Sequence, residues 1–226
     1  MSKIFAIYPT DKKHSTNFLN KIDIYLASKL NKDWRCYKIK FNDECHENCI
    51  NAAKYDSAKF ILFMGHGRSD CLYGSCAEEK GYRNERFIDI YNIEEFSNKI
   101  FFCFSCNSNE NRTNSLGRIA RENGVLCFIG FGDIQTDYIE NENFPKKAIE
   151  VFKGLITKII KESLYISIMN NYTVDRLIDL IKILTNKEMQ NLLLHTKNRH
   201  KKIILKNLFD FKNEIKIFGN RFEPIV

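Results

Sequence analysis

Short apolar runs alternate with amphipathic stretches along most of the chain. Runs rich in Ile, Phe, Val and Cys are bounded by polar turns, a pattern that predicts strands at residues 3–9, 35–41, 59–64, 99–105, 125–131 and 214–219. Elsewhere apolar residues recur every three or four positions, as on one face of a helix. This spacing predicts helices near residues 16–30, 45–54, 115–123, 144–167 and 174–195.

The order of these elements indicates the fold class. Strands that alternate with helices are typical of a parallel sheet, and nearly continuous apolar strands need helices on both faces. We therefore expect an α/β three-layer sandwich with a mostly parallel central sheet, with the run at 214–219 added at one edge. A chain of 226 residues fits a single core and contains no Pro/Ser-rich linker, so residues 1–226 are expected to form one domain.

Charge and composition change this picture little. The formal net charge of +7 would suit a nucleic-acid partner, and the densest basic stretch is 195–202. No aromatic residues for base stacking interleave that stretch, so we interpret it as a solvated helix end and do not expect nucleic-acid binding. The first apolar stretch, Ile4 to Tyr8, is five residues long, and no run approaches the ~18 apolar residues of a membrane span. We expect a cytoplasmic protein without a membrane partner, whose eight cysteines are reduced.

The candidate chemistry lies where two strands end. His66 stands between two glycines after the predicted strand 59–64, and Cys106 follows the predicted strand 99–105. Ligand sites of parallel α/β sheets lie at the carboxyl ends of the strands, and neighbouring strands are ~5 Å apart. If these two strands are neighbours, the histidine and the cysteine converge.

This pair fits nucleophilic catalysis without a cofactor. A thiol is a few per cent ionised at neutral pH, and a nearby histidine can remove its proton and later protonate a leaving amine. Gly67 has no Cβ, so its backbone N–H can approach a developing oxyanion, with the N–H of Cys106 as second donor.

With these residues the sequence resembles the caspase-like cysteine peptidases of the caspase–hemoglobinase fold, and within them the CHAT proteases related to separase. The matching segments are "ILFMGHG", "IFFCFSC", "LGRIARENGVLCFIGFGD" and the C-terminal "IKIFGNRFEP". The resemblance covers roughly residues 3–220. It departs from the family where the Gln-Ala-Cys-Arg-Gly signature is absent, where Ser105-Cys106-Asn107 replaces Ser-Ala-Cys, and where Asn220 replaces an aspartate.

The resemblance implies a cysteine endopeptidase with His66 as general base, Cys106 as nucleophile and protein as substrate. It also implies a regulated effector, of the kind found in bacterial stress or antiphage systems, that a partner protein or a ligand activates. Asp133 and Asp137 follow strand 125–131 and would favour a basic side chain before the cut bond, whereas Arg68 is the candidate for recognising aspartate instead. The polar loops 68–98 and 133–143 are expected to be the movable parts of the site.

Other functions remain open. Cys103 and Cys106 form C-x-x-C, a spacing found in redox dithiols and in zinc sites. On an extended strand their Cα atoms would be about 10 Å apart, too far for a disulfide unless a turn begins at Cys103. "CHENC", residues 45–49, lacks a second close pair of zinc ligands, so we expect no metal. A catalytically inactive interaction domain is the main alternative. A phosphate-binding α/β module would need a glycine-rich loop after the first strand, and "YPTDKKHST" contains no glycine.

Overall fold

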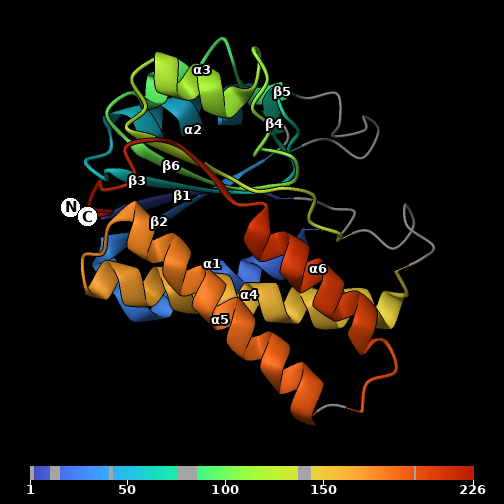
Figure 1. The fold of residues 1–226 in the computed structure, drawn as a ribbon. Coiled ribbons are helices and arrows are strands. Elements are labelled where there is room, and N and C mark those ends of the chain that lie inside the picture. Colours follow the sequence, from blue (N-terminus) through green and yellow to red (C-terminus); the bar gives the residue numbers. More distant parts are fainter. Residues whose placement is uncertain (1–2, 11–15, 41–42, 76–85, 137–143, 196) are drawn as a thin grey trace.

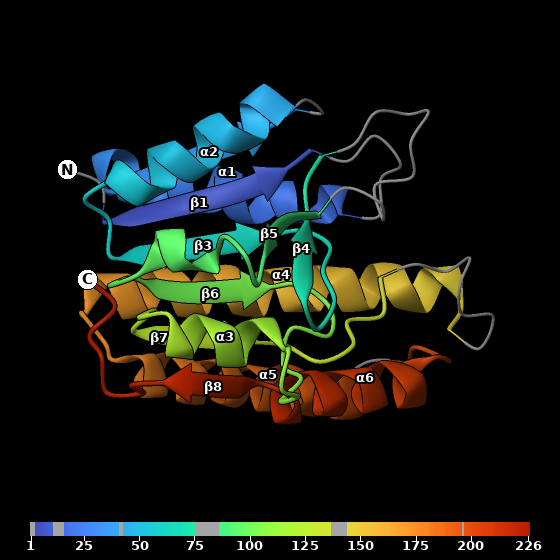
Figure 2. The same cartoon turned by 90° about the horizontal axis from the view of Figure 1, so that it is seen from above.

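The computed structural model describes residues 3–10, 16–40, 43–75, 86–136, 144–195 and 197–226. Its centre is a six-stranded sheet in which the first five strands are parallel and the last is antiparallel. The strands lie side by side in the order β2 (Trp34–Ile39), β1 (Ile4–Pro9), β3 (Phe60–Met64), β6 (Ile100–Phe104), β7 (Cys127–Gly130) and β8 (Lys216–Gly219). Figure 2 shows this order from β1 to β8.

Helices cover both faces of this sheet, as expected for a three-layer α/β sandwich (Figure 1). One layer consists of α1 (Asn20–Leu30), α4 (Lys146–Met169), α5 (Val174–His195) and α6 (Lys201–Asn213). The other consists of α2 (Asp43–Tyr55), α3 (Leu116–Glu122) and the hairpin of β4 (Cys71–Tyr73) and β5 (Arg86–Asp89). Short 3-10 turns lie at Asn17–Leu19, Asn31–Asp33 and Ile93–Phe96.

The sheet separates two hydrophobic cores because successive strand residues point to opposite faces. In β3, Phe60 and Leu62 belong to the core under α1 and α4, whereas Ile61 and Phe63 belong to the core under α2 and α3. All four are fully buried. Both faces of the strand are therefore covered, which explains its continuous apolar sequence.

Two elements differ from the sequence prediction. The segment 68–98, expected to be a polar loop, contains the β4–β5 hairpin, which packs through the buried Leu72 and Ile88. The basic stretch at 195–202 is not a solvated helix end alone, because α5 ends at His195 and α6 begins at Lys201. Helix α6 forms because Ile204, Leu208 and Phe211 recur at helical spacing and bury one face.

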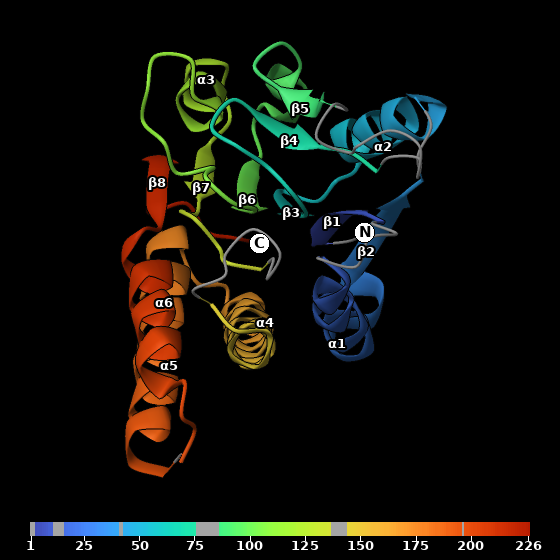
Figure 3. The ribbon, with the colours of Figure 1, turned by 90° about the vertical axis from the view of Figure 1, so that its right-hand side faces the viewer.

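The arrangement of strands brings the predicted site residues to one edge of the sheet. β3 and β6 are adjacent and in register, with Met64 opposite Phe104 at their last positions. The amide of Gly65 donates to the carbonyl of Phe104 at 3.3 Å, which continues the pairing one residue further. Figure 3, viewed toward the carboxyl ends of the parallel strands, shows β3 and β6 side by side in the middle of the sheet.

Candidate active site

His66 and Cys106 line the same narrow pocket at the carboxyl edge of β3 and β6. Gly65, Phe104 and Ser105 line it from the same strand ends, and the remaining lining residues come from the segment before α1 and the segment after β7. Those residues are Thr16, Phe18, Leu19, Ile134 and Thr136. The sheet therefore brings together two side chains that are forty residues apart in sequence.

The thiol of Cys106 is held by the segment that follows β7. Its Sγ donates a hydrogen bond to the carbonyl of Ile134 at 3.4 Å, and Cys106 packs against the core under α4. Burial of the thiol raises the pKa of Cys106 to about 11, and the negative charge of Asp133 adds to this increase. The cysteine is therefore a neutral thiol at pH 7 in this conformation.

A tight turn fixes the direction in which Cys106 points. Ser105 donates its amide to the carbonyl of Cys103 at 2.9 Å, and Asn107 has a φ of 55°. Asparagine tolerates this left-handed conformation better than most residues. The amide of Asn107 then donates to the carbonyl of Gly132 at 3.0 Å, which joins the loop after β6 to the loop after β7.

Gly67 lies where a side chain would not fit. A Cβ at this position would be 2.6 Å from the hydroxyl of Ser105 and 2.9 Å from a methyl of Leu72. Gly67 and Leu72 form an antiparallel bridge whose hydrogen bonds use the amides of Arg68 and Tyr73. That bridge therefore leaves the amide of Gly67 available to another acceptor.

The three predicted recognition residues have different surroundings. Asp133 is exposed near Cys106, and its carboxylate accepts a hydrogen bond from the side-chain amide of Gln135. Asp137 lies outside the described residues. Arg68 donates from two nitrogens to Asp70, at 2.5 and 3.0 Å, and Asp70 also accepts from Arg86 at 3.0 Å. Hydrogen bonding to Asp70 raises the pKa of Arg68, so its charge is balanced within the protein.

The C-x-x-C cysteines lie on opposite sides of the sheet. Cys103 belongs to the core under α2 and α3, where its thiol is 3.1 Å from the hydroxyl of Ser105, whereas Cys106 packs against the core under α1 and α4. Burial raises the pKa of Cys103 to about 12. Both cysteines are free thiols that pack against different cores, and no disulfide joins them. No group of three or more His, Cys, Asp or Glu residues in the described ranges is arranged to hold a metal ion.

Two residues near the site were not predicted, because no sequence motif marks them. Glu214, directly after α6, accepts the amide of Asp133 at 3.2 Å, while its own carbonyl accepts the side chain of Asn109 at 2.7 Å. It thus connects both loops around Cys106. Thr16, only 4% exposed, has a hydroxyl without a hydrogen-bond partner among the described residues. A glutamate 108 residues away from Cys106 gives no local motif, and a lone threonine gives none either.

Comparison with known proteins supports the fold and no more than the fold. No protein-family model matches the sequence, and no curated protein matches it. Among solved structures, the chain is similar to the complex of Porphyromonas gingivalis RgpB pro- and mature domains, with a TM-score of 0.54 and 10% sequence identity. The match covers 97% of this chain and 47% of the RgpB chain, so this chain spans about half the length of the RgpB chain. The similarity supports a caspase–hemoglobinase-like α/β fold, a fold used by cysteine proteases.

None of the helices in the described ranges combines the length and the apolar sequence needed to cross a bilayer.

Proposed function

We propose that this chain is a cysteine endopeptidase in which Cys106 is the nucleophile and His66 is the general base. The observation that supports this best is the shared pocket of the two side chains at the carboxyl edge of adjacent, in-register strands. The caspase–hemoglobinase-like fold supports it in a coarser way, because the fold is compatible with cysteine peptidase chemistry.

The proposed reaction follows from the chemistry of the two groups. His66 removes the proton of the Cys106 thiol, and the thiolate attacks the carbonyl carbon of the peptide bond. The carbonyl oxygen becomes an oxyanion, to which the amides of Gly67 and Cys106 donate. The C–N bond then breaks as the imidazolium gives its proton to the leaving amine. Water, deprotonated by His66, hydrolyses the thioester and restores the free thiol.

We also propose that the described conformation is the resting state of a regulated enzyme. Burial raises the pKa of Cys106 and keeps its thiol protonated, its Sγ is hydrogen-bonded to the carbonyl of Ile134, and the pocket beside it is narrow. An activating protein or ligand would have to displace the segment that contains Ile134. A controlled peptidase of this kind would suit a cytoplasmic effector in a bacterial stress or antiphage response.

The proposed substrate preference is a basic side chain before the cut bond. Asp133 has an exposed carboxylate close enough to Cys106 to influence its pKa. A carboxylate at that position can pair with arginine or lysine of a substrate. Arg68 is less suited to bind an acidic side chain, because Asp70 already neutralises it.

An inactive interaction domain is the second candidate function. The same buried, protonated thiol that indicates a resting enzyme would also be found in a domain that no longer catalyses. The two candidates make different predictions for the Cys106 thiol. A peptidase must have some condition in which this thiol becomes reactive and in which its reactivity requires His66, whereas an interaction domain need not.

The test is cleavage of a fluorescent, unfolded protein substrate by the wild type and three variants, at high enzyme concentration and over hours, so that the minor population in which the Ile134 segment has opened is detected. We expect Cys106→Ala and His66→Ala to abolish cleavage with unchanged circular dichroism, and Cys103→Ala to retain it. Equal loss in Cys103→Ala would favour a redox role for both thiols. A wild-type protein that cleaves nothing, although iodoacetamide modifies its Cys106 completely, would favour the interaction domain.

A further inference from the structure

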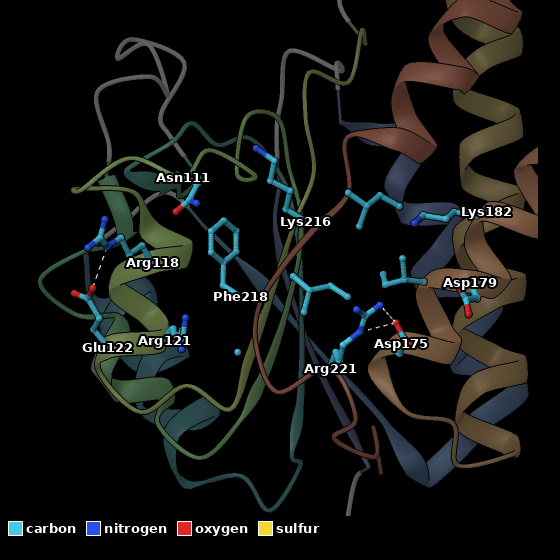
Figure 4. Close-up of a pocket in the computed structure, with 14 residues that line it drawn as sticks. Asn111, Arg118, Arg121, Glu122, Asp175, Asp179, Lys182, Lys216, Phe218 and Arg221 are labelled. Carbon is cyan, nitrogen blue, oxygen red and sulfur yellow. Dashed lines mark hydrogen bonds and ion pairs between the residues drawn. The ribbon is translucent and has the colours of Figure 1, made fainter.

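The outer edge of β8 is open in the part of the chain that the structure describes. β8 is the last strand of the sheet, and its only neighbour among the described strands is β7. A groove of about 1030 Å³ runs along this edge between α3 and α5. Figure 4 shows Lys216 and Phe218 of β8 in its centre, the arginines of α3 on one side and the acidic and basic residues of α5 on the other.

The two walls of the groove differ because strand residues alternate between faces. Phe218 points toward α3, where its ring is 6.2 Å from the ring of Phe128 and where a Cβ on Gly117 would be 2.7 Å from it. Ile217 points to the opposite face, against the core under α5 and α6. If a further strand paired with β8, every second side chain of that strand would face α3, and the side chains between them would face α5.

The wall formed with α3 is basic. Arg118, Arg121 and Lys216 line it, and all three are exposed. Arg118 pairs with Glu122 at 3.0 Å, whereas Arg121 and Lys216 form no ion pair with any described residue. Two uncompensated cations therefore lie beside the open edge of the strand.

The wall formed with α5 is mainly apolar at the level of the strand. Ile178 of α5 and Ile215 and Ile217 around β8 line it. The charged residues on this side are Asp175, Asp179, Lys182 and Arg221. Arg221 donates to Asp175 at 2.9 Å, so that pair is neutral, and Asp179 and Lys182 contribute one charge of each sign.

We propose that the β8 groove binds an extended segment of a partner protein whose acidic side chains alternate with apolar ones. The segment would add to the sheet as a seventh strand, with backbone hydrogen bonds to the free edge of β8. Its acidic side chains would face Arg121 and Lys216, and its apolar side chains would face Ile178 and Ile217. This proposal concerns binding alone and does not depend on peptidase activity.

A second copy of the chain fits the groove less well. Antiparallel pairing of two β8 strands needs a two-fold axis normal to the sheet, which keeps both α3 helices on the same face. The uncompensated charges of Arg121 and Lys216 would then face those of the other copy, and like charges across an interface are unfavourable. An acidic partner segment removes this repulsion.

Fluorescence polarisation with labelled peptides tests the proposal on the intact chain. The probes are a six-residue repeat of Glu and Val, the same repeat with Lys in place of Glu, and a Glu-Val repeat methylated on alternate backbone nitrogens. We expect saturable binding of the first peptide and about tenfold or more weaker binding of the other two, since one reverses the charge and the other removes backbone donors.

Paired variants locate the binding site. Arg121→Glu with Lys216→Glu should weaken binding of the Glu-Val peptide by about tenfold, because attraction becomes repulsion. The control is Lys147→Glu with Lys187→Glu, two exposed positions outside the groove that change the net charge equally. Circular dichroism checks that each variant folds.

Four results would overturn the proposal. Equal binding of the acidic and basic peptides, or full binding of the methylated one, would exclude strand addition guided by charge. Equal weakening by the control pair would mean that overall charge, and not the groove, binds the peptide. A concentration-dependent dimer in sedimentation that the peptide fails to dissociate would mean that a second copy occupies the edge.

Discussion

The thiol of Cys106 donates a hydrogen bond to the backbone carbonyl of Ile134 at 3.4 Å. Ile134 itself is 6% exposed, so the contact is formed under a buried side chain and not at the open surface. A thiol that keeps its proton in a hydrogen bond to this carbonyl is not the thiolate that attacks a substrate. The relationship between these two residues is therefore the feature that we expect activation to change.

The first prediction concerns the reactivity of Cys106 with pH. Because burial raises its pKa to about 11, its alkylation by iodoacetamide at pH 7 should be about 100-fold slower than that of an ordinary thiol. The thiolate fraction rises with pH, so the rate should increase about tenfold per unit between pH 7 and 9. Mass spectrometry of the Cys106 peptide measures the rate, and the urea-unfolded chain serves as control. Equal rates in folded and unfolded chains at pH 7 would contradict this environment.

The second prediction concerns Glu214, which holds the loop next to Ile134. Glu214→Ala removes the acceptor of the Asp133 amide, and a lost hydrogen bond of this kind corresponds to about 0.5–1.5 kcal/mol. We expect the loop to open more often and Cys106 to be alkylated about three- to tenfold faster. Asn213→Ala changes the exposed neighbour and should leave the rate unchanged. Unchanged reactivity in Glu214→Ala would mean that other contacts hold the loop.

Most of the fold could be predicted because its signals are local. Four of the five parallel strands, namely β1, β3, β6 and β7, are apolar enough to be predicted from short windows, and the order of the elements along the chain implies a covered sheet. The β4–β5 hairpin has strands of only three and four residues, flanked by charged positions, which gives a weak strand signal. α6 had the helical spacing of Ile204, Leu208 and Phe211, but the basic run before it obscured where one helix ends and the next begins.

The site could be predicted only in part. The convergence of His66 and Cys106 follows from a topological rule, because both residues come directly after neighbouring parallel strands. The contact with Ile134 uses a backbone carbonyl, which every residue possesses, so no residue type marks it. The connection from Glu214 joins segments that are distant in sequence, and only tertiary packing reveals it.

The third prediction tests the space around Gly67. Gly67→Ala places a Cβ 2.6 Å from the Ser105 hydroxyl, so the strand ends must move apart and stability should fall by about 1–3 kcal/mol. Peptidase activity should fall as well, because the Gly67 amide would shift with its backbone. The control is Gly154→Ala in α4, where a Cβ meets nothing within 4 Å. That variant should stabilise the protein by about 0.5–1 kcal/mol through helix propensity. Urea denaturation measures both changes, and a neutral Gly67→Ala would contradict the close packing.

The last prediction concerns the side chain recognised before the cut bond. Fluorogenic peptides that end in Arg, Lys, Asp or Leu would be compared, and we expect the highest kcat/KM for Arg or Lys because Asp133 lies beside Cys106. Asp133 is exposed and water screens its charge, so Asp133→Asn should lower kcat/KM for the Arg peptide by only about fivefold and leave the Leu peptide unchanged. Asp179→Asn removes an exposed carboxylate on α5, remote from the Cys106 pocket, and should change neither. A preference for Asp that disappears in Arg68→Ala would instead assign recognition to Arg68, and would require its ion pair with Asp70 to break when substrate binds.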